Sequence, residues 1–301
     1  MFKLLITGGA GFIGSHLAEI ALRAGFEVHI IDDLSVGRRI FVPRAAKFHL
    51  LDIRSPKLFN LVKKIKPEFI CQLAGINVIS KAAANPAEDV SIAVAGTVNL
   101  LQAVKDLKIK KFLYVSSCAV YGESRLPAKE NTVINPSIFY SLSRATAESY
   151  VNFYAQNFGL PTVVVRLTNV YGPRQTAGTI PRWLRSLDKN EPLILEGKGE
   201  QIRDYLYVTD AANGLISALQ KLQGVYNLST GEAISMREIV LALGQVIGQI
   251  PKVDYCPIPA GEIINRVFDS SALARDTGWQ PQVPLLDGLR LTLKWWKEKV
   301  K

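Results

Sequence analysis

The chain has 301 residues, of which 48% are hydrophobic and 21% are charged, and its formal net charge is +10. A chain of this length can bury a large core, and its three scattered cysteines, Cys71, Cys118 and Cys256, do not form a disulfide framework. It contains no run of about 18 uncharged apolar residues and no C-x-x-C or H-E-x-x-H spacing. We therefore expect a cytoplasmic protein with no membrane span and no metal site.

The excess positive charge is spread along the chain, without a basic stripe that is interleaved with aromatic residues. This distribution argues against nucleic acid as a partner. It favours an acidic, phosphate-bearing small molecule.

Short β-rich apolar runs alternate with helical patterns over residues 1–166. The predicted strands are FKLLIT, EVHIID, KFHLLD, EFICQLA, KFLYVSS and PTVVVRL, and helices are expected near 12–24, 57–65, 88–107 and 139–158. This alternation predicts an α/β fold, a Rossmann-type doubly wound parallel sheet with helices on both faces. Gly- and Pro-rich loops then separate shorter elements, so 167–301 are expected to form mainly a smaller C-terminal substrate-binding lobe, with returns to the first domain near 204–222.

A glycine-rich turn follows the first expected strand and opens the first expected helix. Its spacing, G-x-x-G-x-x-G, places glycine at Gly8, Gly11 and Gly14. The first permits a tight turn, the second lets the backbone approach a pyrophosphate, and the third permits close packing of the helix. The helix begins at Phe12 and Ile13, where free N–H groups and positive potential favour an anion. These features predict a dinucleotide site.

Acidic residues at the ends of the next two strands fit the adenosine half of the dinucleotide. Asp32 can accept hydrogen bonds from the ribose hydroxyls and would repel a 2′-phosphate, which favours NAD over NADP. Arg38 and Arg39 follow closely enough to reach such a phosphate, although loop arginines also commonly face solvent. Asp52 and Ile53 either hold the adenine edge or end the strand in a capped turn.

Tyr140 and Arg144 are four residues apart in an expected helix, so they can share one face. At ~5 Å and an effective dielectric constant of ~20, a cation stabilises a phenolate by roughly 3 kcal/mol. Tyr140 is therefore a candidate proton shuttle. The alternative is a surface tyrosine beside a solvated arginine.

Several segments together, in order along nearly the whole chain, resemble the extended short-chain dehydrogenase/reductase family. These segments are TGGAGFIGSHL, IDDLS, LDI, QLAG, GTVNLLQA, VSSCAVYG, YSLSR, RLTNVYGPRQ and RDYLYV. Within the family, the chain is similar to the NAD-dependent nucleotide-sugar epimerases and dehydratases, especially UDP-glucose 4-epimerase-like members. The resemblance implies NAD as cofactor, a nucleotide-sugar substrate, epimerisation at C4 through a keto-sugar, and a homodimer that pairs helices near 88–107 and 140–158.

The resemblance also implies roles for individual residues. Ser117 matches the active-site Ser/Thr, Tyr140 matches the catalytic base, and Arg144 stands where the family has lysine. Asn169 and Arg203 match residues that hold the substrate diphosphate, with Arg266 nearby, whereas without the resemblance Asn169 could equally form an Asx-turn and Arg203 a salt bridge. Further cofactor contacts are expected from Asp33, Ser35, Gly37, Leu73, Ala74, Gly75 and Ser116.

The chain departs from the family pattern at several positions. The planar fork of Arg144 is not equivalent to an ammonium group, and Ala93 stands where many relatives have asparagine. Cys118 and Ala119 follow Ser117 where family dehydratases carry an Asp-Glu pair, so dehydration is not expected. The leading hypothesis is an active epimerase. The alternatives are an NAD-binding sensor or assembly partner with little catalysis, and a nucleotide-sugar reductase or dehydrogenase.

Overall fold

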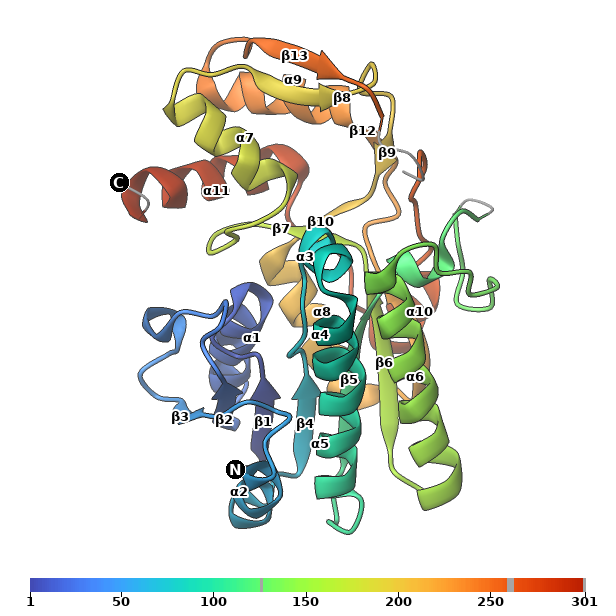
Figure 1. The fold of residues 1–301 in the computed structure, drawn as a ribbon. Helices are drawn as coiled ribbons and strands as arrows, with labels where there is room; N and C mark the ends of the chain where they lie inside the picture. Colours follow the sequence, from blue (N-terminus) through green and yellow to red (C-terminus); the bar gives the residue numbers. More distant parts are fainter. Residues whose placement is uncertain (125–126, 259–262, 300–301) are drawn as a thin grey trace.

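The computed structural model describes residues 1–124, 127–258 and 263–299. Its main element is a seven-stranded sheet in the order β11-β6-β5-β4-β1-β2-β3, in which every neighbouring pair is parallel (Figure 1). This sheet confirms the predicted α/β Rossmann-type fold. Its strands are β1 (Lys3–Thr7), β2 (Glu27–Asp32), β3 (Lys47–Leu50), β4 (Phe69–Gln72), β5 (Lys111–Ser117), β6 (Thr162–Leu167) and β11 (Gly224–Leu228).

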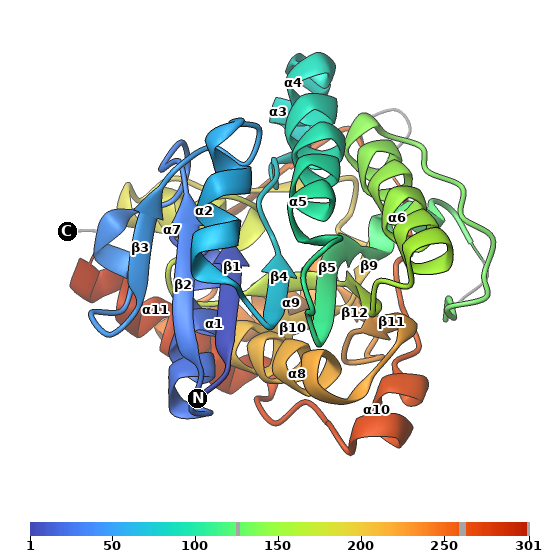
Figure 2. The ribbon, with the colours of Figure 1, turned by 90° about the horizontal axis from the view of Figure 1, so that it is seen from below.

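Helices cover both faces of the sheet, as Figure 2 shows from below. One face carries α1 (Phe12–Arg23) and α8 (Val208–Lys221), and the other carries α2 (Lys57–Ile65), α5 (Thr97–Val104) and α6 (Phe139–Phe158). A separate apolar core lies on each face, with Leu17 and Leu215 in the first and Leu58 and Val151 in the second. Two buried faces explain why the central strands β1, β4, β5 and β6 are mainly apolar runs.

The helix expected near 88–107 is divided in the structure. It consists of α4 (Pro86–Val90), a π-helical segment η2 (Ser91–Gly96) and α5, and it is preceded by the short α3 (Ile79–Ala84). The predicted helix near 139–158 is α6, which ends because Gly159 adopts a left-handed conformation with φ of +64°.

A smaller lobe lies above the carboxyl ends of the sheet strands (Figure 1). It contains α7 (Thr179–Asp188), α9 (Met236–Ile247) and α11 (Leu285–Lys299), with β8 (Leu193–Glu196) paired to β13 (Val253–Cys256). Loops that leave the parallel strands meet this lobe, which is where ligands bind in such sheets. The remaining elements are η1 (Arg39–Phe41), η3 (Cys118–Tyr121), β7 (Asn169–Tyr171), β9 (Ile202–Arg203), β10 (Tyr205–Tyr207), β12 (Ile234–Ser235) and α10 (Ser271–Thr277).

The described residues lack both a membrane-spanning helix and a cluster of metal ligands. No helix among them has the length and apolar character that crossing a membrane requires. No three His, Cys, Asp or Glu side chains among them are grouped so that they could hold a metal ion.

Candidate active site

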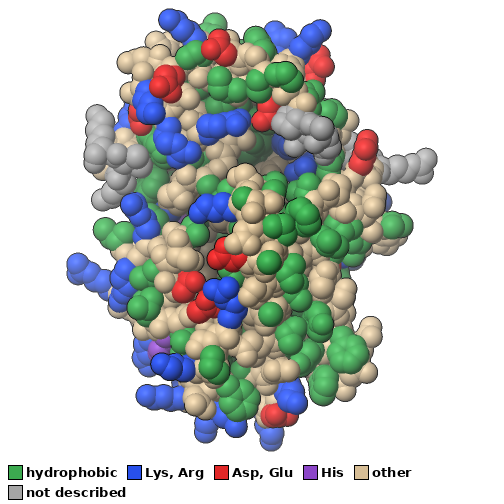
Figure 3. Space-filling view, viewed as in Figure 1, with side chains coloured by type: hydrophobic (Ala, Val, Ile, Leu, Met, Phe, Trp, Pro, Cys, Tyr) green, Lys and Arg blue, Asp and Glu red, His purple; other side chains and the backbone are tan. Residues whose placement is uncertain are grey.

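A cleft of about 810 Å³ lies between the carboxyl edge of the sheet and the smaller lobe, and hollows are visible in this region of the face in Figure 3. The structure brings every predicted site residue to this one cleft, although their individual roles stay predictions. The residues are Gly8, Gly11, Phe12, Ile13, Gly14, Asp32, Asp33, Ser35, Gly37, Asp52, Ile53, Leu73, Ala74, Gly75, Ser116, Ser117, Tyr140, Arg144, Asn169, Arg203 and Arg266.

The glycine turn packs so closely against neighbouring backbone that side chains at two of its glycines would not fit. Gly8 has φ of +69°, and a Cβ there would lie 2.9 Å from the backbone nitrogen of Ala74. A Cβ at Gly14 would lie 2.2 Å from the Gly8 carbonyl oxygen. Gly11 is the N-cap of α1 and provides no capping side chain, so the first-turn N–H groups remain available to an anion. The turn therefore fits the pyrophosphate of a dinucleotide.

The carboxylate of Asp32 is fixed at the end of β2. Its two oxygens accept N–H groups from Ala10 at 2.9 Å and Leu34 at 2.8 Å. Burial raises the pKa of Asp32, and the two N–H donors oppose that rise. Each oxygen has a further lone pair that could accept a ribose hydroxyl. Arg39 stacks over the Phe48 ring at 4.6 Å, an arrangement that uses this arginine in packing.

Asp52 caps a turn, which is one of the two roles considered for it. Its carboxylate accepts the Arg54 N–H at 2.7 Å and also pairs with the Arg54 guanidinium. The Arg54 side chain lowers the pKa of Asp52. Asp52 also lines the cleft, so contact with the adenine edge stays a prediction.

Ser117 and Tyr140 come from two elements that meet at the cleft. Ser117 ends β5, and its Oγ accepts the Ala119 N–H at 3.1 Å, which leaves the hydroxyl proton available to a ligand. Tyr140 is half-buried in the first turn of α6, at the positive end of the helix dipole. The neighbouring Ser116 also lines the cleft, but its hydroxyl donates to Glu148.

Arg144 places a cation beside Tyr140. The Arg144 Cζ lies 5.1 Å from the centroid of the tyrosine ring, and Nη2 donates to the Ile76 carbonyl at 2.9 Å. The residue is 5% exposed. The charge of Arg144 is thus buried at the cleft wall, in contact with the loop that follows β4.

Asn169, Arg203 and Arg266 line the opposite part of the cleft. The Asn169 amide donates to the Asp204 carbonyl at 3.3 Å, and Arg203 Nη1 donates to the Ile202 and Ile264 carbonyls, both at 2.9 Å. These bonds hold an amide and a guanidinium in one wall. Both groups suit recognition of phosphate oxygens.

Four further basic residues line the cleft, and sequence reasoning did not select them. They are Lys81 on α3, Arg174 in the loop after β7, and Arg182 and Arg185 on α7. Arg174 pairs with Glu19, which ties its loop to α1. The one local signal was the three-residue spacing of Arg182 and Arg185, which places both on one helix face. Basic side chains therefore outnumber acidic ones in the lining of the cleft.

Cys118 directly follows Ser117 and also lines the cleft. Its Sγ donates to the Arg166 carbonyl at 3.2 Å, and burial raises the pKa of the thiol well above its usual range. A buried, protonated thiol does not act as a base.

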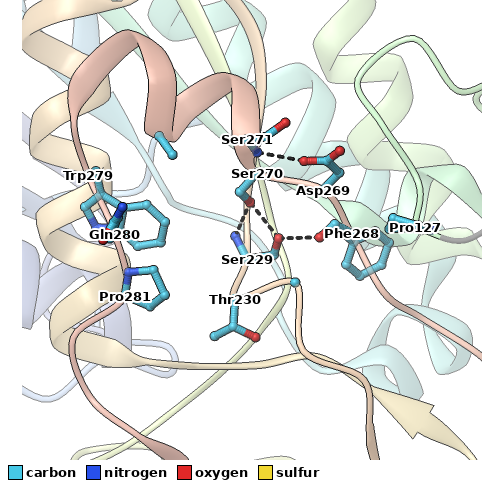
Figure 4. A pocket seen from close by; sticks show the side chains of 12 residues that line it. Pro127, Ser229, Thr230, Phe268, Asp269, Ser270, Ser271, Trp279, Gln280 and Pro281 are labelled. Atoms are coloured by element: carbon cyan, nitrogen blue, oxygen red, sulfur yellow. Dashed lines mark hydrogen bonds between the residues drawn. The ribbon is translucent and has the colours of Figure 1, made fainter.

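A second, smaller cavity of about 320 Å³ lies beside the N-terminus of α10 (Figure 4). Several polar groups in its wall bond to one another. Ser229 and Ser270 hydroxyls are 2.6 Å apart, and the Asp269 carboxylate accepts the Ser271 N–H at 2.7 Å. The candidate active site is therefore the larger cleft, which contains the glycine turn and the tyrosine.

Comparison with known proteins agrees with this geometry. Residues 4–229 match the model of the NAD dependent epimerase/dehydratase family. The chain belongs to this family. A provisionally named UDP-glucose 4-epimerase of Methanocaldococcus jannaschii is 34% identical over 301 residues, which cover 98% of each chain.

Solved structures of family members share the whole fold. The UDP-glucose 4-epimerase of Thermotoga maritima, crystallised with UDP-glucose, has a TM-score of 0.96 and 29% identity, with 100% of both chains covered. That of Thermus thermophilus, solved with NAD, has a TM-score of 0.94 and 32% identity, with 99% of this chain and 100% of that chain covered. The predicted family and its NAD cofactor are confirmed. The members of this family are NAD-dependent nucleotide-sugar epimerases and dehydratases.

Proposed function

We propose that this protein is an NAD-dependent epimerase that inverts C4 of a nucleotide-diphosphate sugar. The observation that supports this most directly is the single cleft that contains the glycine turn, the Ser117, Tyr140 and Arg144 side chains, and a wall of phosphate-binding groups. When bound, NAD would accept a hydride from the sugar and return it.

The residues of the chain would manage the proton and the orientation of the sugar. Tyr140 would remove the proton of the C4 hydroxyl, to which Ser117 donates a hydrogen bond, while Arg144 stabilises the phenolate. After the keto-sugar turns its other face, Tyr140 returns the proton. The hydride and the proton both come back to the sugar, so there is no net oxidation.

The diphosphate of the substrate would bind the wall formed by Asn169 and Arg203. Arginine presents a planar fork of donors that matches phosphate oxygens, and an amide adds a further donor. Arg266 lines the same cleft and could reach the same group. This anchoring leaves the sugar free to rotate beside Tyr140, which inversion requires.

The residues after Ser117 favour epimerisation over dehydration. Elimination of water needs an acid and a base near the sugar, whereas Cys118 is buried with its thiol protonated and Ala119 has no polar side chain. Nothing at this position of the chain can supply the second proton transfer.

The test is to incubate the purified protein with UDP-glucose, UDP-galactose and their uronic acid and N-acetyl analogues, and to follow C4 inversion by NMR. Tyr140→Phe should reduce turnover by at least about a hundredfold because it removes the acid-base group. Tyr255→Phe is the matched control, since this tyrosine is 66% exposed on β13. Accumulation of NADH would indicate a dehydrogenase instead, and NAD binding without turnover across the panel would favour the non-catalytic alternative.

We further propose that the protein is a homodimer that pairs through α6. Phe139, Leu142, Tyr150 and Phe153 are 43–54% exposed and follow one face of this helix. Figure 3 shows hydrophobic side chains gathered over α5 and α6. Light scattering should give the mass of a dimer for the parent and of a monomer for Phe153→Asp. Ile250→Asp, at an exposed position between α9 and β13, should remain dimeric.

A further inference from the structure

Two fully buried polar groups surround Arg144, the carboxylate of Asp89 and the hydroxyl of Tyr114. The Tyr114 hydroxyl interacts with the Arg144 guanidinium. In the described structure, both carboxylate oxygens of Asp89 are without a hydrogen-bond partner. A buried carboxylate of this kind is rare in folded proteins and costly, so it requires an explanation.

Asp89 lies within electrostatic reach of Arg144. It is part of α4, which packs against α6, the helix that carries Arg144. Burial by itself would lower the pKa of Arg144, but Tyr114, Tyr140 and Asp89 together raise it. No hydrogen bond joins the two side chains, so the Arg144 cation acts on the buried carboxylate through space.

Gly75 provides the space in which the guanidinium lies. A Cβ at Gly75 would be 2.5 Å from Nη2, 2.6 Å from Nη1 and 2.9 Å from Cζ of Arg144. These three atoms belong to the planar group, so the guanidinium packs directly against the Gly75 backbone. Any side chain at position 75 would push it away from the Ile76 carbonyl that it now binds.

We propose that Gly75 and Asp89 are positioning residues that form a socket for the Arg144 guanidinium and make arginine the working cation beside Tyr140. This inference rests on the proposed function. Gly75 supplies the flat space that a planar fork needs, and Asp89 supplies the opposite charge. A lysine at position 144 is shorter and not planar, so a side chain at position 75 should disturb it less than it disturbs the guanidinium.

The first test is a double-mutant cycle between Gly75→Ala and Arg144→Lys, measured by NAD calorimetry and by the melting temperature without ligand. With arginine present, Gly75→Ala should weaken NAD binding by about tenfold or more and lower the melting temperature. With lysine present, the same change should weaken binding by less than about threefold. If the Gly75→Ala protein folds with lysine at position 144 but not with arginine there, that result would show the same dependence. Equal effects in both backgrounds would overturn the role of Gly75.

Gly214→Ala is the matched control for this cycle. Gly214 is on α8, and a Cβ there would lie 2.5 Å from the Leu228 side chain in the core, remote from Arg144. Its effect on the melting temperature should be the same whether residue 144 is arginine or lysine.

The second test combines Asp89→Asn with Arg144→Met. In the Arg144→Met protein the buried carboxylate has lost its counter-charge, so Asp89→Asn should raise the melting temperature there. With arginine present, it should lower the melting temperature or leave it unchanged. A change of the same sign and size in both backgrounds would overturn the role of Asp89.

The pH profile of kcat separates positioning from a purely structural role. Tyr140, Tyr114 and Asp89 act electrostatically on Arg144, and Glu148 acts on Tyr114. Removing the Asp89 charge leaves the cation uncompensated, so the acid limb of the profile should move down by about half a pH unit or more in Asp89→Asn. An unmoved limb would contradict electrostatic positioning. The measurements of melting temperature and of NAD binding do not require turnover. They therefore test the socket even if the proposed reaction is wrong.

Discussion

Replacing Glu148 with glutamine is expected to destabilise the folded protein by about 3 kcal/mol. Glu148 on α6 and Arg166 on β6 are 2% and 3% exposed. Arg166 Nη2 lies 2.7 Å from Glu148 Oε2, and its Nε bonds both carboxylate oxygens at 3.1 Å and 3.2 Å. The same carboxylate accepts the Ser116 hydroxyl, one residue before Ser117.

The magnitude follows from what the substitution leaves behind. Removing one partner of a buried pair costs about 3–5 kcal/mol because the other charge stays buried without compensation. We expect a loss at the lower end of this range, because glutamine keeps the shape of glutamate and one acceptor oxygen. In addition, Arg166 Nη1 still donates to the Tyr121 hydroxyl at 2.8 Å. A loss of this size is a large part of the total stability of about 5–15 kcal/mol.

Urea unfolding followed by circular dichroism measures the loss. The control is Asp287→Asn, which breaks a pair with Arg290 whose side chains are 55% and 57% exposed, and which should cost less than about 1 kcal/mol. The double change Glu148→Leu with Arg166→Met should recover most of the stability, because no unpaired charge remains. A single substitution no worse than the control, or a double one as unstable as the single, would refute this reasoning.

Three further predictions concern pH and the glycine turn. Burial raises the pKa of Asp204 from 3.8 to about 6, so the stability it provides is complete below about pH 4 and is lost, by up to about 3 kcal/mol, as the pH rises through 6. Asp204→Asn should remove that slope from urea titrations, and an unchanged slope would contradict it. Burial lowers the pKa of His16 from 6.5 to about 4, so its stability is present above pH 6.5 and is lost as the pH falls towards 4. His16→Gln should therefore make the protein less sensitive to acid in the same titrations, and an equally steep acid loss would show that this histidine does not matter. Gly14→Ala should weaken NAD binding by about a hundredfold in calorimetry, because its Cβ would lie 2.2 Å from the Gly8 carbonyl oxygen, whereas Gly248→Ala, with open space around it, should bind NAD like the parent. Equal affinities for the two variants would mean that the turn does not hold the cofactor.

Much of the fold could be predicted because its signals are local. Most strands of the main sheet are apolar runs bounded by polar or turn residues, and the predicted covering helices have an apolar face with a regular period. The edge strand β11 and the helix α8 were not among the predicted elements. The division of the third predicted helix into α4, η2 and α5 was not predictable. A π-helical segment depends on how the helix packs, and here η2 contacts α6.

Sequence alone determined the chemistry of the glycine turn and the pairing of Tyr140 with Arg144. The backbone conformation of a turn and the face of a helix depend on residues only a few positions apart. Only the tertiary structure decided that Gly75 leaves space for the Arg144 guanidinium and that Asp89 lies buried near it. These contacts join residues far apart in the chain, and their distances exist only once the sheet and its helices have packed.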